Sequence, residues 1–434
     1  MIRMSILLLL LCTTSLSASP EIPGADQKTP IALVGATVHP VSGPAIDDGV
    51  LVFDEGKIIA VGLAKKTDIP KSAKKINVAG KHVFPGLLDA YTNIGLVEIN
   101  AVRATRDMAE VGRINPNVQA NVAVNPDSEL IPITRSNGVL LTVSAPAGGL
   151  ISGRAAVLQL DGWTYEDLTL SASAGLMIQW PRMTPVVNWW EEKSTEEQRK
   201  ERDESIARLH DFFDDARAYQ KARTAGSEQE FDSRLESMLA VLDGTIPLIV
   251  RADEIQQIQT AVAFSAKQKL RMILLGGYDA PHCASLLKKH NVPVIVAATY
   301  RLPRRRSDSY DSPFTLPARL AKLGIPFCIS SSGRFGASNV RNLPYNAAMA
   351  AAFGLPQDEA LRSITLSPAE ILGVSDRVGS LEAGKDATLF ISTGNALETT
   401  SLVEQAFIQG REIDLSDRHK RLWKKYEEKY RRQK

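Results

Sequence analysis

Short apolar runs separated by turn-forming residues dominate the first part of the chain. The runs at 31–34, 49–53 and 57–62 have clusters of Gly, Pro, Ser, Asp and Glu between them. Runs of this length, bounded by turn residues, are typical of β-strands joined by tight turns. The pattern therefore predicts a small antiparallel sheet within residues 30–84.

From residue 85 onward, apolar strands alternate with longer helix-forming stretches. The predicted strands lie at 138–143, 247–250, 272–275, 292–296 and 325–329, and the predicted helices at 254–269, 284–291 and 316–323. This alternation indicates parallel strands connected by crossover helices. The pattern alone leaves open whether these strands form an α/β barrel or a doubly wound sheet. Residues 372–413 return to short strands.

Two segments are dominated by charged residues. Residues 191–223 combine many Glu, Lys, Arg and Asp with a thin apolar stripe, which predicts a long and largely solvated helix. A lid or a partner surface is the alternative for this insertion. Residues 418–434 carry nine Lys and Arg against two Glu, and Leu422, Tyr426 and Tyr430 recur at every fourth position. That spacing predicts a basic amphipathic helix, which we expect to dock on its own domain, with an anionic membrane as the alternative.

The composition is that of a large globular protein. The chain has 434 residues, of which 44% are hydrophobic and 23% charged, enough for a sizeable core and more than one lobe. The formal net charge of +2 gives no strong positive field, which argues against nucleic acid as a partner. No apolar run reaches the length that crosses a bilayer, so no transmembrane segment is predicted.

The first residues have the pattern of a secretory signal. Arg3 provides positive charge, residues 6–12 are apolar, and small residues follow. We therefore predict a signal peptide over residues 1–19 and an exported protein, periplasmic or extracellular. Lipidation of Cys12 is a weaker alternative, because leucines rather than small residues precede it. The two later cysteines are too few for a disulfide framework.

Several segments from residue 85 onward resemble those of one known family. The segment 85–95, which begins Pro-Gly-Leu-Leu-Asp-Ala-Tyr, resembles the first-strand signature of the amidohydrolase superfamily. Residues 339–344 and 364–373 resemble the end of that family's barrel, and residues 378–387 resemble the return to its second domain. Within the superfamily, the chain is similar to the imidazolonepropionase-like branch of exported proteins.

The resemblance implies an α/β fold with a (β/α)8 TIM barrel over residues 85–371, which contains the charged insertion 191–223. It also implies a composite β-sandwich built from both chain ends, residues 30–84 and 372–413, with the basic helix at 414–434 beyond it. Family members are hydrolases of carbon–nitrogen, non-peptide bonds in small molecules, and a zinc-class metal activates their water.

The residues at the family's metal-ligand positions are unsuited to a metal. The family uses a His-x-His pair, a Lys or His, another His and an Asp. A guanidinium stays protonated and has no free lone pair, so an arginine cannot coordinate a cation. We therefore predict no metal cofactor there, and a zinc-class ion only if another site exists. The residues at these positions are Tyr91, Asn93, Arg251, Gly276 and Ser332.

Three functions stay open. In the first, the barrel mouth binds a small anionic or polar molecule and has lost metal-dependent hydrolysis. In another, the chain is a partner subunit of an active paralogue, within a homo- or hetero-oligomer. The residues expected at the mouth are Tyr91, Asn93, Arg251, Tyr278, Ser332 and Arg341.

In the remaining function, hydrolysis persists through a carboxylate near the strand ends, which acts as a general base. Asp89, Asp253 and Asp279 are the candidate catalytic residues. Asp253 follows Arg251 by two residues, so an ion pair between these two side chains is the simpler interpretation of that position.

Overall fold

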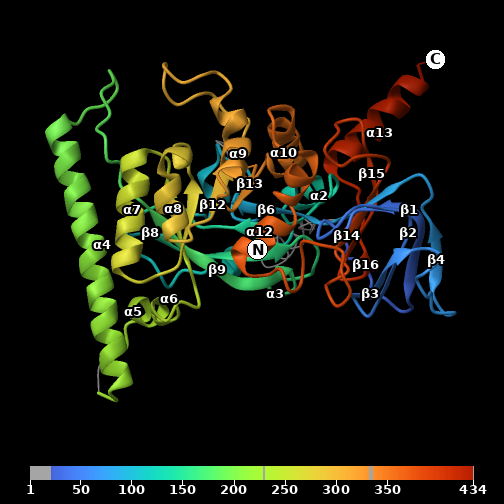
Figure 1. The fold of residues 1–434 in the computed structure, drawn as a ribbon, viewed down its shortest axis with the longest axis horizontal. Coiled ribbons are helices and arrows are strands. Elements are labelled where there is room, and N and C mark those ends of the chain that lie inside the picture. Colours follow the sequence, from blue (N-terminus) through green and yellow to red (C-terminus); the bar gives the residue numbers. More distant parts are fainter. Residues whose placement is uncertain (1–20, 228–229, 332–335, 434) are drawn as a thin grey trace, which may run out of the picture.

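The computed structural model describes residues 21–227, 230–331 and 336–433. Its strands form two sheets that lie side by side, and helices pack around one of them (Figure 1). The predicted signal peptide 1–19, Cys12 and Ser332 lie outside the described residues, so the predictions made for them stay predictions.

The first sheet joins strands from both ends of the chain. Its strands are β1 (Ile31–Val38), β2 (Ile46–Asp54), β3 (Lys57–Leu63), β4 (Lys74–Asn77), β5 (His82–Pro85), β14 (Leu389–Ser392), β15 (Val403–Ile408) and β16 (Arg411–Glu412). They follow the order β16-β15-β14-β5-β1-β2-β3, with β4 paired to β1. β5 and β14 pair antiparallel and place Phe84 opposite Phe390, which joins the two chain ends. Because all eight strands belong to one sheet, the composite β-sandwich implied by the resemblance is not confirmed and stays a prediction.

The second sheet is a nearly closed barrel of eight strands in sequence order. The strands are β6 (Leu87–Thr92), β7 (Val139–Ser144), β8 (Ile151–Gln159), β9 (Thr169–Gln179), β10 (Leu248–Ala252), β11 (Met272–Gly276), β12 (Val294–Ala297) and β13 (Phe327–Ser330). The five strands predicted in this part of the sequence are confirmed as β7 and β10 to β13. The fold is therefore α/β, with a TIM-like barrel.

One strand departs from the expected (β/α)8 pattern. β8 pairs antiparallel with both β7 and β9, whereas the other neighbouring strands of this sheet pair parallel. Only residues 145–150 separate β7 from β8. A parallel connection needs a crossover of about a dozen residues or more, so this short link forces β8 to run back beside β7. The expectation of eight βα units is corrected to a barrel with one reversed strand.

Helices cover the outside of the barrel (Figure 1). The α-helices are α2 (Leu130–Arg135), α3 (Tyr165–Leu168), α4 (Thr195–Thr224), α5 (Ser233–Ser237), α6 (Leu239–Leu242), α7 (Ile255–Lys267), α8 (Ala284–Lys289), α9 (Ser312–Lys322), α10 (Leu343–Ala352), α11 (Gln357–Arg362), α12 (Leu366–Leu372) and α13 (Arg418–Arg431). The short 3-10 helices are η1 (Arg103–Thr105), η2 (Ala120–Ala123), η3 (Ala280–Cys283) and η4 (Val340–Asn342). The three predicted helices are confirmed as α7, α8 and α9.

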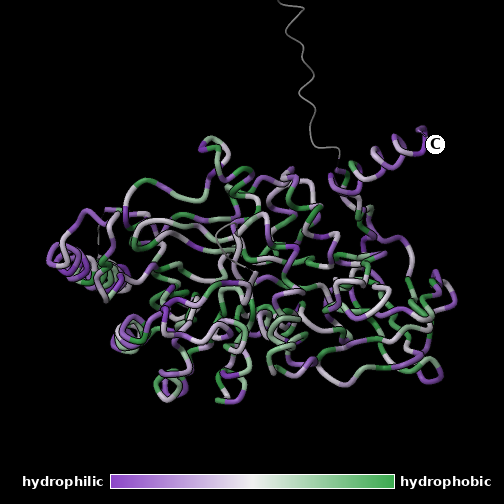
Figure 2. The backbone as a smooth tube through the Cα atoms, turned by 90° about the horizontal axis from the view of Figure 1, so that it is seen from above, coloured by the Kyte–Doolittle hydropathy of each residue, from purple (hydrophilic) through white to green (hydrophobic). Residues whose placement is uncertain are grey.

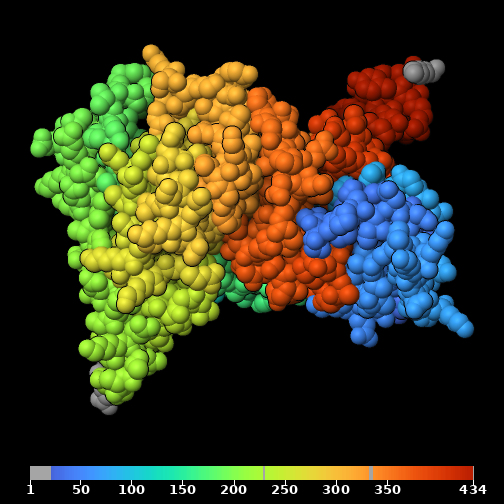
Figure 3. Space-filling view, in the orientation of Figure 1, coloured from blue at the N-terminus to red at the C-terminus, as the bar shows by residue number. Residues whose placement is uncertain are grey.

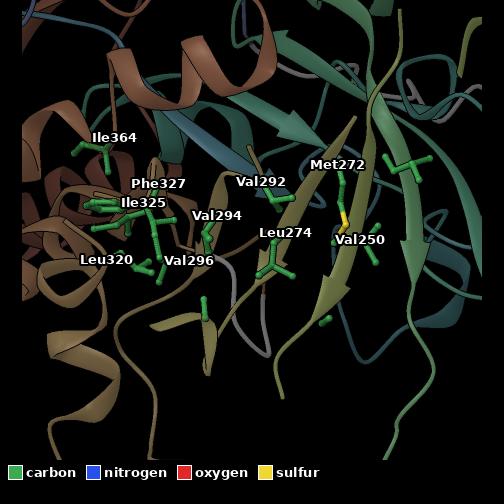
Figure 4. Close-up of a cluster of buried hydrophobic side chains, with 14 of the residues drawn as sticks. Val250, Met272, Leu274, Val292, Val294, Val296, Leu320, Ile325, Phe327 and Ile364 are labelled. Carbon is green, nitrogen blue, oxygen red and sulfur yellow. The ribbon is translucent and has the colours of Figure 1, made fainter. Parts of the chain in front are cut away.

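The barrel strands are buried on both faces. Val250 and Leu274 point outward into a layer shared with helix residues such as Leu320, part of which Figure 4 shows. Their neighbours Ile249 and Ile273 belong to a separate cluster inside the barrel. Successive strand side chains point to opposite faces, so two buried faces require continuous apolar runs. This explains why the strands were visible in the sequence as uninterrupted hydrophobic stretches.

The barrel closes between β13 and β6 without a regular backbone ladder. The main-chain N–H groups of Leu88 and Ile329 donate to the carbonyls of Ile364 and Ser363, so a short segment before α12 bridges part of this seam. Asp89, which is fully buried, bridges the remainder through side-chain hydrogen bonds to β13 and Ser331. The seam therefore depends on a buried carboxylate.

The charged insertion forms α4, at the far end of the molecule from α13 (Figures 1 and 2). Its N-terminus has a capping box, in which Ser194 and Glu197 satisfy each other's backbone N–H groups. Leu209, Phe213 and Ala216 are fully buried against the barrel's outer layer. The predicted stripe is therefore used for packing on α7, and the remaining faces of the helix carry the charges.

Candidate functional site

The C-terminal ends of the parallel barrel strands meet at one rim, which is where barrel enzymes place their active sites. Three of the predicted site residues lie in the strands that end there: Tyr91 in β6, Arg251 in β10 and Gly276 in β11. The loop of residues 298–311, between β12 and α9, starts at the same rim. We call it the rim loop.

Arg251 faces the barrel mouth. It lies two residues after Ile249, whose side chain is inside the barrel, so the alternation of strand side chains places Arg251 on the same face. Its strand neighbours in register are Gln179 and Leu275. The residue is exposed, and no carboxylate of the described residues forms an ion pair with it.

Arg301, on the rim loop, is a second cation close to Arg251. Its guanidinium lies 4.9 Å from the centre of the Tyr278 ring, and its Nη1 is 3.7 Å from an oxygen of Asp253. Burial lowers the pKa of Arg301, and the neighbouring charges of Arg304 and Arg251 lower it further, although Asp253 opposes them. Its Nε and Nη2 atoms are buried without a hydrogen-bond partner within the described residues.

The predicted catalytic carboxylates Asp253 and Asp279 form ion pairs with arginines of the rim loop. Arg304 donates to Asp253 at 2.8 Å, and Arg305 forms a two-point pair with Asp279. The hydrogen bond to Asp279 holds the pKa of Arg305 above its ordinary value. The proposed pair between Asp253 and Arg251 is not formed, because the rim loop brings two other arginines to this carboxylate.

Tyr278 fixes the rim loop to β11. Its buried hydroxyl donates to Asp308 at 2.9 Å and accepts from the main-chain N–H of Arg304 at 3.3 Å. The N–H of Tyr278 itself donates to Asp253 at 3.3 Å. Arg301 and Arg305 both lie against this ring, with guanidinium carbons 4.9 and 5.9 Å from its centre. Tyr278 is therefore brought to the predicted place, as a support for the cations.

Gly276 leaves no room for the side chain that a metal ligand would need. Its φ of +104° lies in a region that side-chain-bearing residues rarely adopt. A Cβ atom there would lie 2.8 Å from an oxygen of Asp253 and 3.2 Å from the carbonyl of Ala252. Restoring a histidine at this position would therefore also require the Asp253 carboxylate to move.

Asp89 is buried beneath the mouth and is already saturated with donors. One of its oxygens accepts from the Ser330 hydroxyl at 2.6 Å and the Tyr91 N–H at 3.2 Å. The other accepts from the Ser331 N–H at 3.1 Å and from the Ser331 hydroxyl. Burial raises the pKa of Asp89 to about 6 despite these hydrogen bonds. The carboxyl group is placed to hold the barrel seam together.

The remaining predicted residues do not come together in one described group. Tyr91 is buried in the cluster inside the barrel. The Asn93 amide donates to the carbonyl of Ala145 at 2.8 Å, which ties β6 to the end of β7. Arg341 lies in η4, where its carbonyl accepts from the Asn137 side chain at 2.6 Å, and no described contact joins its side chain to the other predicted residues. Ser332 lies outside the described residues.

The donor set at the rim does not fit the family's metal. Across the parts of the chain that the structure describes, no group of three or more His, Cys, Asp and Glu side chains is arranged to hold a metal ion. At the rim itself, the ligand positions offer a buried phenol, an engaged amide, a guanidinium and a glycine. None of these replaces an imidazole or a carboxylate as a zinc ligand.

Two other features lie outside this rim. His39 and His82, distant in sequence, meet in the first sheet with ring nitrogens 2.9 Å apart, and burial and the neighbouring ring lower the pKa of His39 to about 4. A cavity of about 1300 Å³ opens at the opposite ends of β10 to β13, and Arg271 and Phe327 are among its lining residues. Neither feature includes a predicted site residue.

The arginines of the rim loop were not among the residues predicted from the sequence. Arg301, Arg304 and Arg305 follow a buried strand within a few residues, and acidic residues follow two neighbouring strands at Asp253 and Asp279. Since parallel strands end at one rim, this complementary pattern was a usable signal. It predicts a loop held down by ion pairs.

Comparison with known proteins agrees with this architecture. The amidohydrolase family model matches residues 174–412. The amidohydrolase from Thermotoga maritima MSB8 has a similar structure, with a TM-score of 0.77 and 25% sequence identity over 88% of this chain and 99% of that one. Molinate hydrolase, at 16% identity with a TM-score of 0.55 over 90% of this chain and 96% of that one, shares the fold.

Sequence relatives match over smaller shares of their own length. The amidohydrolase tasK from Hapsidospora irregularis is 21% identical over 86% of this chain and 42% of its own length. Imidazolonepropionase from Mesorhizobium japonicum is 29% identical over 34% of each chain. The matched parts thus span less than half the length of these curated relatives. The family match, by contrast, covers more than half of this chain and includes β9 to β16. The chain belongs to the amidohydrolase family.

Proposed function

We propose that this member of the amidohydrolase family binds a small anion at its barrel mouth and does not carry the family's catalytic metal there. One observation supports this most strongly. Arg251 and Arg301 are neighbouring cations, and Arg251 has no ion pair among the described residues, while two nitrogens of Arg301 have no hydrogen-bond partner there.

The charges at this place favour an anion over a metal. Two guanidinium groups close together repel each other and would repel a metal cation more strongly. A bound anion would interact favourably with both. Buried donors without partners are costly, so a ligand that accepts from Arg301 also removes that cost.

The geometry of Arg301 indicates the kind of anion. Its unpartnered nitrogens, Nε and Nη2, lie along one edge of the planar guanidinium group. Two parallel N–H groups match the two oxygens of a carboxylate or of a phosphate group. We infer a small molecule with one such group, which enters past the exposed Arg251.

Hydrolysis by the predicted carboxylates is less well supported. The oxygens of Asp253 and Asp279 accept from the guanidinium groups of Arg304 and Arg305, and Asp89 is buried with four donors around it. A role as a partner subunit is also less well supported, because the apolar stripe of α4 is covered by the chain's own barrel.

Binding of inorganic phosphate and of succinate, measured by titration calorimetry, tests the proposal. We expect one of the two probes to bind at millimolar concentration or better, and Arg251→Met to weaken that binding about tenfold or more, through loss of a charge-assisted pair. The binding should fall as salt is added, because salt screens the interaction.

Arg271→Met is the matched control. Arg271 is also an exposed arginine, but it lies directly before β11, at the opposite end of the barrel, where it lines the large cavity. The proposal predicts that this variant binds the probe like the unmodified protein. Loss of binding in Arg271→Met alone would place the anion in that cavity, and failure of both probes to bind would reject the proposal.

A further inference from the structure

The C-terminal helix α13 exposes an apolar face instead of packing it. No residue of the helix is buried. Leu422, Trp423, Tyr426 and Tyr430 are 42%, 62%, 48% and 59% exposed. The expectation that this helix docks on its own domain is therefore wrong.

These four side chains share one side of the helix. Successive residues of an α-helix are rotated by about 100°, so residues 422, 426 and 430 and residue 423 fall within an arc of about 100°. Three of the four residues are Trp or Tyr. These two residue types are enriched where a membrane meets water, because their rings are apolar and carry a polar atom.

The rest of the helix is strongly basic. Residues 418–433 contain eight Lys and Arg and two Glu, a net charge of +6. Arg418, Lys424, Lys425 and Lys429 form no ion pair within the part of the chain that the structure describes. Lys425 and Lys429 lie close to the aromatic face instead, with their nitrogens about 6 Å from the rings of Tyr426 and Tyr430. The aromatic face is therefore bordered by free positive charge.

Among the residues that the structure describes, the contacts between this helix and the body come from its start. Asp417 caps it by accepting from the N–H of Lys420 at 2.9 Å, and Arg421 pairs with Glu21 at 3.2 Å and Glu129 at 3.1 Å. Beyond these contacts the helix extends away from the body, as Figure 3 shows. It is thus free to approach a flat surface.

We propose that α13 is a membrane-surface helix that binds anionic lipid. Its aromatic face would enter the boundary between head groups and acyl chains, and its lysines and arginines would pair with lipid phosphates. The helix would lie in the plane of the surface, since no helix among the described residues is long and apolar enough to cross a bilayer. The surplus of six positive charges favours an anionic lipid surface over another copy of this helix, which would repel it.

Cosedimentation of the full chain with vesicles tests the proposal. One set of vesicles is phosphatidylcholine alone, and the other is an equimolar mixture of phosphatidylcholine and phosphatidylglycerol. We expect binding to the mixed vesicles to be about tenfold stronger or more, and to weaken as salt is added. Two variants should each lose about tenfold or more of it: the triple change Trp423→Ser, Tyr426→Ser and Tyr430→Ser, and the triple change Lys424→Glu, Lys425→Glu and Lys429→Glu.

The matched control is the double change Trp189→Ser and Trp190→Ser. These tryptophans are also exposed but lie before α4, at the other end of the molecule, so their removal should leave vesicle binding unchanged. Because all the replaced side chains are exposed, each variant should unfold at the same temperature as the unmodified protein. That measurement separates a lost surface from a lost fold.

Three results would overturn the proposal. Equal binding to both kinds of vesicle would remove the role of anionic lipid. Unchanged binding of both helix variants would assign the membrane contact to another part of the chain. A dimer that becomes a monomer in the serine variant, without vesicle binding by the unmodified protein, would make the face a self-association surface. Arg251→Met should bind vesicles normally, so this proposal can fail independently of the anion site.

Discussion

Replacing Asp89 with alanine is expected to lower the free energy of unfolding by about 3–5 kcal/mol. The change removes the acceptor of four hydrogen bonds from Tyr91, Ser330 and Ser331, and it leaves these donors buried between β6 and β13. Regular backbone pairing does not join these two strands, so the seam loses a direct link, although the Ser330 hydroxyl keeps the carbonyl of Tyr91 as an acceptor at 2.9 Å. Denaturant unfolding followed by circular dichroism measures the effect.

The conservative change Asp89→Asn removes the charge but keeps the size and shape of the side chain, so it isolates the effect of the charge on stability. Burial raises the pKa of Asp89 from 3.8 to about 6, so the folded protein holds this proton more tightly than the unfolded chain does. The native state is therefore favoured at low pH, and this contribution is lost as pH rises from about 4 to about 7. Over that range the unmodified protein should lose roughly 2–3 kcal/mol relative to Asp89→Asn, which cannot titrate.

Unfolding curves of both proteins at several pH values give this difference directly. Other carboxylates contribute equally to both proteins and cancel. A difference that stays constant with pH would contradict the account of Asp89 as a buried group with a raised pKa. A difference that grows in favour of the unmodified protein would mean that the seam holds the ionised form preferentially.

Phe213→Ala is expected to lower the free energy of unfolding by about 3–5 kcal/mol, because it empties a fully buried aromatic site between α4 and α7. The Phe213 and Phe264 rings pack edge to face, with ring centres 5.1 Å apart, in the layer that also holds Trp180. If α4 only extended into solvent, this substitution would hardly change the free energy of unfolding. The measurement is the denaturant midpoint and its slope.

Phe212→Ala is the matched control for this change. Phe212 is the adjacent residue on the same helix, and its side chain is only partly buried. We expect it to cost less than half as much as Phe213→Ala. Equal and small effects in both variants would show that α4 contributes little to the stability of the barrel.

Much of the fold could be predicted from the sequence, because the barrel strands bury both faces. Residues 247–250 and 272–275 had to be apolar without interruption, and this made β10 and β11 visible. The reversal of β8 was not visible, since the direction of a strand depends on the length of the link before it rather than on its own side chains. The undocked α13 was missed for a related reason: periodicity reveals a face but not what covers it.

The candidate site was predictable only in part. Arg251, Gly276 and Tyr278 lie at or beside the ends of strands, where the resemblance placed them. The partners of Asp253 and Asp279 come from the rim loop, 25 or more residues further along the chain, so only the common rim of the parallel strands links them. Asp89 looked like a candidate base in the sequence, whereas its position depends on a barrel seam that only tertiary structure creates.

If arginines occupy the place of the family's metal at the barrel mouth, the purified protein should carry no zinc, and its metal content can be measured. The full chain is produced with added zinc, purified without chelators or a His tag, desalted, and subjected to elemental analysis. We expect far less than one zinc-class ion per chain. One or two such ions retained per chain would contradict it, because a metal centre would then exist that the residues at the rim do not explain.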